Sequence, residues 1–191
     1  MNKDLNKLSK EIYEANKAKG FHEETYSHEH MLCLVISELM EAVEADRKNR
    51  KADLKTFEEF MGGVKDKHYD TMYAKCFKEF IKDTVEEELS DAVIRLFDTV
   101  GALGLSLYSF SKDSCDYGTT KNVFENCLFT ESIFIIIKRL LNSPLSLNLV
   151  ISSTIFYVEN LCEVMGIDLW KHVELKLKYN SLRPYKHGKK Y

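Results

Sequence analysis

Two pairs of carboxylates in this 191-residue chain have the spacing of helix neighbours. Glu38 and Glu41 form the first pair, and Glu88 and Asp91 form the second. Residues three apart lie on the same side of a helix, one turn from each other. Both pairs fall within apolar stripes, where a buried carboxylate is costly unless a cation meets it. The sequence therefore predicts a hard divalent metal held between two packed helices.

The chemistry expected of such a platform is phosphoryl transfer. Mg²⁺ prefers oxygen ligands and often bridges protein carboxylates to substrate phosphates. It would neutralise developing charge and could generate the attacking hydroxide. The competing interpretation is that the pairs are solvated helix faces or weak surface ion pairs, which are common. Asp98 shares a face with Asp91, and is expected to be a further ligand, an acceptor behind a ligand, or a partner for Arg95 or another cation.

Candidate substrate contacts occur near both ends of the chain. Near the N-terminus, Phe21 could stack on a base and Asn16 could hydrogen-bond to it; the alternative is a core phenylalanine after a glycine cap. Cations and an asparagine near the last helix could grip phosphates, and a solvated basic terminus is the alternative. They lie in the tail from Lys176 to Tyr191, which includes Lys176, Asn180, Arg183, Lys186, Lys189 and Lys190. Few clustered cations on a chain of net charge −3 argue against a nucleic-acid partner.

Composition favours one globular unit. Hydrophobic residues make up 45% of the chain and charged residues 30%, so a single domain over residues 1–191 is expected. Five cysteines without a CxxC pair indicate reduced, buried thiols. The N-terminus has no signal-peptide core, and the apolar stretches 134–141 and 145–158 are too short or too polar to span a membrane. We therefore expect a cytoplasmic protein without a membrane partner.

Hydrophobic periodicity indicates an all-α fold, because no convincing strand alternation occurs. Helices are predicted over about 3–19, 28–47, 69–107 with a break near Asp83, 122–141, 145–165 and 168–183. Ser27 and Asp168 are predicted N-caps, and Pro184 ends the last helix. Residues 48–64 are expected to form a loop or short helical turn, and residues 111–120 a loop.

Four segments, taken in order, resemble the MazG-like nucleoside triphosphate pyrophosphohydrolases. Residues 34–47 (LVISELMEAVEADR) resemble the first metal helix of that family, and residues 87–98 (EELSDAVIRLFD) resemble the second. Residues 17–21 (KAKGF) resemble the segment ahead of the first metal helix. Residues 179–189 (YNSLRPYKHGK) resemble the closing segment of a MazG-like subgroup.

The resemblance implies an all-α bundle with a four-helix-type core that forms homodimers or dimers of dimers. It implies hydrolysis of an NTP or dNTP to the monophosphate and pyrophosphate, with Mg²⁺ or Mn²⁺ as cofactor, in sanitation or balance of nucleotide pools. Glu38, Glu41, Glu88 and Asp91 carry over as metal ligands. Glu87 is the candidate for orienting water, and the substrate contacts carry over as Lys176, Asn180, Arg183 and Lys186.

Two departures from the family pattern concern length. The interval between the two carboxylate pairs is longer than is typical, and the extra residues fall at about 48–80. A second insertion, at about 108–165, precedes the final helix and contains the predicted helical hairpin. Such a hairpin could cover the site or change the dimer interface. Substrate choice and oligomeric geometry are therefore left open by the sequence.

Three rival functions were weighed against the leading one. A di-iron carboxylate bundle generally needs Glu-x-x-His pairs, and no histidine here has a glutamate three residues before it. An HD-type phosphohydrolase is disfavoured because no His-Asp dipeptide occurs. The third rival is a non-catalytic helical module for nucleotide binding or interaction, which would tolerate loss of the carboxylates. The sequence leaves open the base and sugar preference and the phosphorus that water attacks.

Overall fold

The computed structural model describes residues 4–109, 115–142 and 145–188. Within these ranges the chain is helical and contains no strand, so the all-α prediction is confirmed for this part. The α-helices are α1 (Leu5–Ala18), α2 (His28–Arg47), α3 (Leu54–Gly62), α4 (Tyr69–Phe80), α5 (Val85–Ala102), α6 (Cys115–Glu125), α7 (Phe129–Asn142), α8 (Leu147–Val164) and α9 (Leu169–Leu182). Two short 3-10 segments are η1 (Asp66–His68) and η2 (Tyr185–Gly188).

Side-chain caps set where several helices begin. The Ser27 side chain accepts a hydrogen bond from the backbone N–H of His30, and Asp168 does the same for Lys171. Both predicted caps are therefore confirmed, and Asp4, Asp53 and Thr84 cap α1, α3 and α5 in the same way. The predicted break near Asp83 is also confirmed. Asp83 has a φ of 57°, a left-handed conformation that no helix can continue through.

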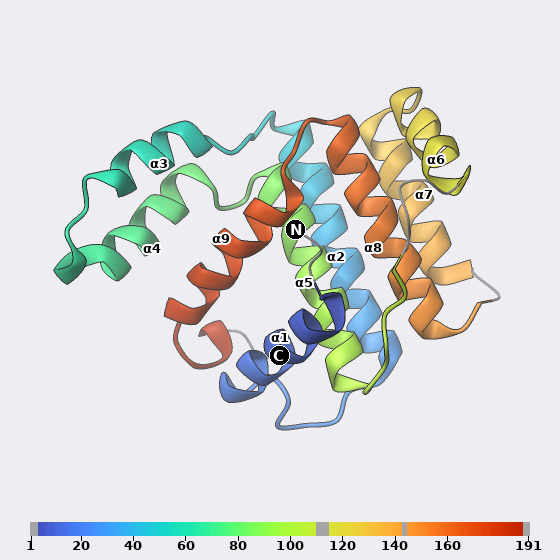
Figure 1. The fold of residues 1–191 in the computed structure, drawn as a ribbon, viewed down its shortest axis with the longest axis horizontal. Helices are drawn as coiled ribbons and strands as arrows, with labels where there is room; N and C mark the ends of the chain where they lie inside the picture. Colours follow the sequence, from blue (N-terminus) through green and yellow to red (C-terminus); the bar gives the residue numbers. More distant parts are fainter. Residues whose placement is uncertain (1–3, 110–114, 143–144, 189–191) are drawn as a thin grey trace.

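Helix α5 lies at the centre of the molecule. It contacts α1, α2, α8 and α9 (Figure 1). Figure 1 also shows that α2 and α5 run side by side in opposite directions. The apolar stripe of α5 beside the second carboxylate pair includes Leu89, Ala92 and Leu96, and all three are fully buried. This antiparallel pair brings the middle of α2 next to the first half of α5, which is where the two carboxylate pairs lie.

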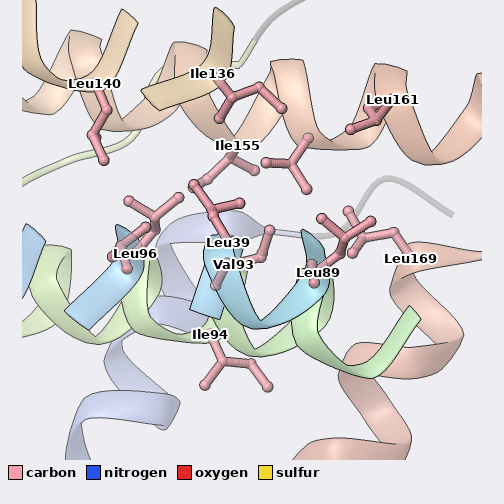
Figure 2. Packing of buried hydrophobic residues seen from close by; sticks show 14 of the residues in the cluster. Leu39, Leu89, Val93, Ile94, Leu96, Ile136, Leu140, Ile155, Leu161 and Leu169 are labelled. Atoms are coloured by element: carbon pink, nitrogen blue, oxygen red, sulfur yellow. The ribbon is translucent and has the colours of Figure 1, made fainter. Parts of the chain in front are cut away.

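Helices α7 and α8 cover one face of the α2–α5 pair with apolar side chains. Figure 2 shows Leu39 of α2 and Val93 of α5 pointing toward Ile136 of α7 and Ile155 of α8, while Ile94 points to the other side. The hairpin of the second predicted insertion therefore packs on the face that does not carry the carboxylates. The main hydrophobic core forms along this contact.

Helices α3 and α4 form a second hairpin, which extends away from the main core and packs on α9 (Figure 1). Tyr73 donates a hydrogen bond to the backbone carbonyl of Leu175 (2.8 Å), and the Phe77 and Tyr179 rings stack at 4.3 Å. The expectation of a loop or single turn at 48–64 was wrong, because α3 runs for nine residues. Its helix forms because Asp53 caps it and because Phe57 and Met61 are buried on one face.

Other boundaries also differ from the prediction. Helix α5 ends at Ala102 rather than near residue 107, and Gly104 then adopts a φ of 60°. Residues 115–120 belong to α6 instead of a loop, and residues 111–114 lie outside the described ranges. Cys76 and Cys162 are buried free thiols, but Cys33 is exposed, so burial was wrongly expected there.

Helix length and composition bear on the expected absence of a membrane span. In the described ranges, no single helix is long and apolar enough to cross a membrane. Only α8 and α9 taken together pass such a test, across a bend of 111°.

Candidate metal centre and adjoining pocket

Three of the four predicted metal ligands meet between α2 and α5. Glu38, Glu88 and Asp91 each place a carboxylate oxygen within 4.8 Å of the others. The exposed fractions of Glu38 and Glu88 are only 3% and 4%, while the Asp91 side chain is 15% exposed. The cluster is therefore nearly closed on the protein side and opens to solvent beside Asp91.

Glu41 does not join this cluster. It is exposed, and its carboxylate accepts a hydrogen bond from the Ser37 hydroxyl at 3.3 Å. Glu41 instead lines a separate surface hollow together with Glu88, Asp83 and Arg50. Glu88 thus borders both regions, and Glu41 lies one helical turn after Glu38 on α2.

Two cations from the same chain are paired with the carboxylates. Arg95, one turn after Asp91 on α5, donates to Glu38 through Nε. Lys176 of α9 is 4% exposed and donates through Nζ to Glu87 and to Asp91, the latter at 2.8 Å. Glu87 also accepts the backbone N–H of Asp83 at 2.8 Å. Lys176 was expected to contact substrate and Glu87 to orient water, but both are buried and bonded to each other. They hold Asp91 and the start of α5 in place.

The carboxylates still outweigh the cations in their environment. Burial and the neighbouring charges of Glu87 and Asp91 raise the pKa of Glu88 to about 9. Burial and the charge of Asp91 also raise the pKa of Glu38, although Arg95 opposes them. A raised carboxyl pKa means that the ionised form lacks compensating positive charge. Three converging oxygen donors with this deficit fit a hard divalent cation such as Mg²⁺.

A pocket adjoins the cluster on the side of Asp91. Asn16, Phe21, Asn180 and Arg183 line it together with Asp91, so four of the six predicted substrate contacts share one pocket. The remaining lining residues are His22, Tyr26, His30, Met31, Leu34, Ile94, Arg95, Asp98 and His187. The pocket is thus walled by α1, α2, α5, α9 and η2, and its rings come mainly from the segment between α1 and α2.

The other two predicted substrate contacts lie elsewhere. Lys176 is buried behind Asp91, and Lys186 pairs with Glu23 at 2.9 Å without lining the pocket. Asp98 lines the pocket but is not among the clustered ligand atoms. Its Oδ1 lies 2.9 Å from Nε2 of His22, so its partner is His22 rather than Arg95.

Sequence reasoning missed Arg95, His22 and His187 as site residues. Arg95 was detectable, because it follows Asp91 by four residues and so must share its helix face. The two histidines gave no such signal. Each reaches the pocket through an irregular segment whose path depends on tertiary contacts.

Known proteins were then compared with this chain. No family model, curated protein or solved structure matched it. The interpretation of the site therefore rests on its own geometry and charge.

Proposed function

We propose that this protein is a Mg²⁺-dependent nucleoside triphosphate pyrophosphohydrolase of the cytoplasm, which hydrolyses an NTP or dNTP to the monophosphate and pyrophosphate. The observation that carries the proposal is the meeting of Glu38, Glu88 and Asp91, because Asp91 also lines a pocket that contains Phe21 and Arg183. The MazG-like resemblance of segments 34–47 and 87–98 points to the same carboxylates. A role in sanitation or balance of nucleotide pools follows from that activity.

The metal would be held by Glu38, Glu88 and Asp91, with Mn²⁺ as an alternative to Mg²⁺. Glu41 would join only after its side chain turns toward Glu88. When bound, the ion would supply charge neutralisation at the phosphates and a water of lowered pKa. Its double charge would also offset the burial and the repulsion by Glu87 and Asp91 that raise the pKa of Glu88.

The chain's own residues divide the remaining work between the two ends of the substrate. Arg95 and Arg183 line the pocket and can donate to phosphate oxygens, for which a guanidinium is well shaped. Lys176 acts indirectly, by fixing the orientation of the Asp91 carboxylate. Phe21 offers a face for base stacking and Asn16 a donor and an acceptor at the pocket wall.

The homodimer or dimer of dimers that the resemblance implies is also a proposal. Helices α7 and α8 already bury the apolar face of α2 and α5 within one chain. A second copy would therefore have to use another surface. The outer face of α7 offers one, because Phe134 and Leu141 are exposed there. Light scattering on the eluting protein would measure the oligomeric state.

The activity is tested by incubating the protein with each NTP and dNTP, with Mg²⁺ or with EDTA, and resolving the products. Monophosphate plus pyrophosphate that EDTA abolishes is the expected result. Glu38→Gln should lower kcat at least about a hundredfold, the effect of removing one group that stabilises transition-state charge. Glu59→Gln is the matched control, because Glu59 is an exposed glutamate of α3 remote from the site.

Three outcomes would contradict the proposal. Full activity of Glu38→Gln would show that the carboxylate cluster is not the active site. Absence of turnover with every nucleotide, in protein that still binds Mg²⁺, would instead favour the non-catalytic nucleotide-binding module. Diphosphate plus orthophosphate as products would mean a different phosphohydrolase reaction on the same cluster.

A further inference from the structure

The last described residues fold back on the segment that follows α1. We call residues 185–188 the C-terminal clasp. The backbone N–H of Lys186 donates to the carbonyl of Lys19 at 2.8 Å, and the Tyr185 hydroxyl and the Lys186 ammonium both bond to Glu23. Gly20 lies directly under the Tyr185 ring, where a Cβ would overlap it. The clasp is therefore held by a backbone bond, an ion pair and a close contact that requires glycine.

These contacts hold the clasp in an uncommon backbone conformation. Lys186 and His187 have φ values of 47° and 50°, in the left-handed region that residues with a Cβ usually avoid. Arg183 adds a hydrogen bond from Nη2 to the carbonyl of His187 at 3.2 Å. Consecutive residues in this region persist only where their surroundings hold them, and such positions often lie at ligand sites. The conformation turns the His187 side chain into the pocket wall.

The His187 ring has one buried nitrogen without a partner. Its edge meets the face of Phe21, with ring centroids 5.0 Å apart at 75°. Nε2 is buried and makes no hydrogen bond, whereas the ring does bond to the backbone carbonyl of Asn180. A carbonyl can only accept, so the proton lies on Nδ1 and Nε2 keeps a lone pair. Burial, together with the charges of Arg183 and Lys19, lowers the pKa of His187 to about 4, which keeps the ring neutral.

Buried polar atoms in proteins are nearly always hydrogen-bonded, so a pocket-lining acceptor without a partner marks a place for a donor on a ligand. Asp91 of the metal centre, Phe21 and His187 all line this one pocket. A nucleotide whose phosphates meet the carboxylate cluster and whose base stacks on Phe21 would bring its nucleoside part next to His187, because the two rings are in contact. This orientation rests on the proposed function.

We propose that His187 is a specificity-determining residue, whose Nε2 accepts a hydrogen bond from a donor on the nucleoside part of the substrate. Two groups on a nucleoside supply this chemistry, an N–H of the base and a hydroxyl of the sugar. Asp98 and Asn16 place further acceptors in the same pocket, which favours nucleosides rich in donors. The C-terminal clasp holds Nε2 of His187 in position.

The test measures binding of nucleoside monophosphates by calorimetry in EDTA, so that neither metal nor turnover is needed. The probes are AMP, GMP, CMP and UMP with their 2′-deoxy and 3′-deoxy forms. His187→Phe keeps an aromatic ring and removes the nitrogen. It should weaken binding of the preferred nucleotide about tenfold and abolish the difference in affinity between nucleotides. If base discrimination disappears, the donor is on the base; if discrimination between sugars disappears, it is the hydroxyl.

Two further variants keep the result interpretable. His187→Gly accepts the positive φ without strain and should lose the same discrimination, so it decides the matter if His187→Phe does not fold. His28→Phe makes the same exchange at the exposed start of α2, outside the pocket, and should retain the preference. In the wild type, the ¹⁵N resonance of His187 Nε2 should shift when the preferred nucleotide binds.

An unchanged order of affinities in both His187 variants would overturn the inference, as would an equal loss for every nucleotide. Failure of the two proposals can be told apart. Mg²⁺-dependent hydrolysis with an unaltered preference in His187→Phe would remove the role of His187 and leave the activity standing. His187-dependent binding without hydrolysis of any triphosphate would do the reverse.

Discussion

The paired helices α2 and α5 have two buried faces of opposite chemical character. Leu39 and Glu38 are chain neighbours with exposed fractions of 0% and 3%, yet Leu39 meets α7 and α8 whereas Glu38 meets Arg95. Burying a leucine stabilises the fold by roughly 1.5–3 kcal/mol. Burying a carboxylate is costly unless it is paired. The apolar face toward α7 and α8 therefore stabilises the molecule. The face that carries the carboxylates destabilises it, because like charges are held close together there.

The difference explains how the site can tolerate its own repulsion. The apolar face is continuous over α2, α5, α7 and α8, so it can hold the helix pair while the carboxylates oppose one another. Lys176 and Arg95 offset part of the negative charge. The three predictions below test this division, beginning with the largest expected effect.

Lys176→Met should destabilise the protein by about 3–5 kcal/mol, because it leaves Glu87 and Asp91 buried without their cation. Urea unfolding would measure the change. Lys178→Met is the matched control, since Lys178 is 41% exposed and pairs with the surface residue Asp70. The control should change stability by less than about 0.5 kcal/mol. Equal losses of stability in the two variants would show that Lys176 does not offset the buried charges of Glu87 and Asp91.

Stability of the metal-free protein should fall as pH rises from about 5 to 9. The folded-state pKa of Glu88, about 9, lies above its ordinary value of 4.5, so in this window the folded protein retains a proton that the unfolded chain has released. The slope is limited to about 1.4 kcal/mol per pH unit for one proton. Because Mg²⁺ bound at the proposed site would displace that proton, its stabilising effect should grow over the same window.

Thermal unfolding at a series of pH values, with and without Mg²⁺, would measure both effects. Glu88→Gln mimics the protonated acid, so it should flatten the pH dependence and lose most of the Mg²⁺ effect while folding normally. A wild-type stability that rises through this window would contradict the charge balance inferred for the cluster.

Ile136→Val, on the apolar face, should cost about 0.5–1.5 kcal/mol of stability and leave Mg²⁺ affinity unchanged. Ile136 is fully buried between α7 and the helix pair, so the lost methyl group leaves a small void (Figure 2). Leu128→Ala, just before α7, is the control and should change stability little, because Leu128 is 69% exposed. Weakened Mg²⁺ binding by Ile136→Val would mean that the two faces are coupled more strongly than proposed.

Much of the helical framework could be predicted from periodicity. The buried stripe Leu89, Ala92 and Leu96, the caps Ser27 and Asp168, and the break at Asp83 follow from local rules. Helix α3 could not be predicted in the same way, because it is only nine residues long and ends at the Gly62–Gly63 pair. Helix α3 forms because Phe57 and Met61 are buried in a cluster with residues of α4 and α9. Helix α9 is far along the chain, so no local pattern indicates this burial.

The candidate site was predictable only in its ligand types. The spacing of Glu38 with Glu41 and of Glu88 with Asp91 indicates shared helix faces, but the rotation of α2 against α5 decides which members meet. That rotation leaves Glu41 exposed and buries Glu38. Likewise, a lysine in a basic tail gives no sign that Lys176 will be buried between two carboxylates.

By itself, the sequence determined the all-α class, the main helices and the carboxylate pairs, since these depend on contacts between residues a few positions apart. Tertiary structure alone decided that Lys176 and Arg95 would occupy the charged face, that Glu41 would leave it and that the clasp would carry His187 to Phe21. Those outcomes join residues more than fifty positions apart, or depend on how packed helices are rotated. Pairings of that kind are selected by packing and by charge compensation, which no local pattern records.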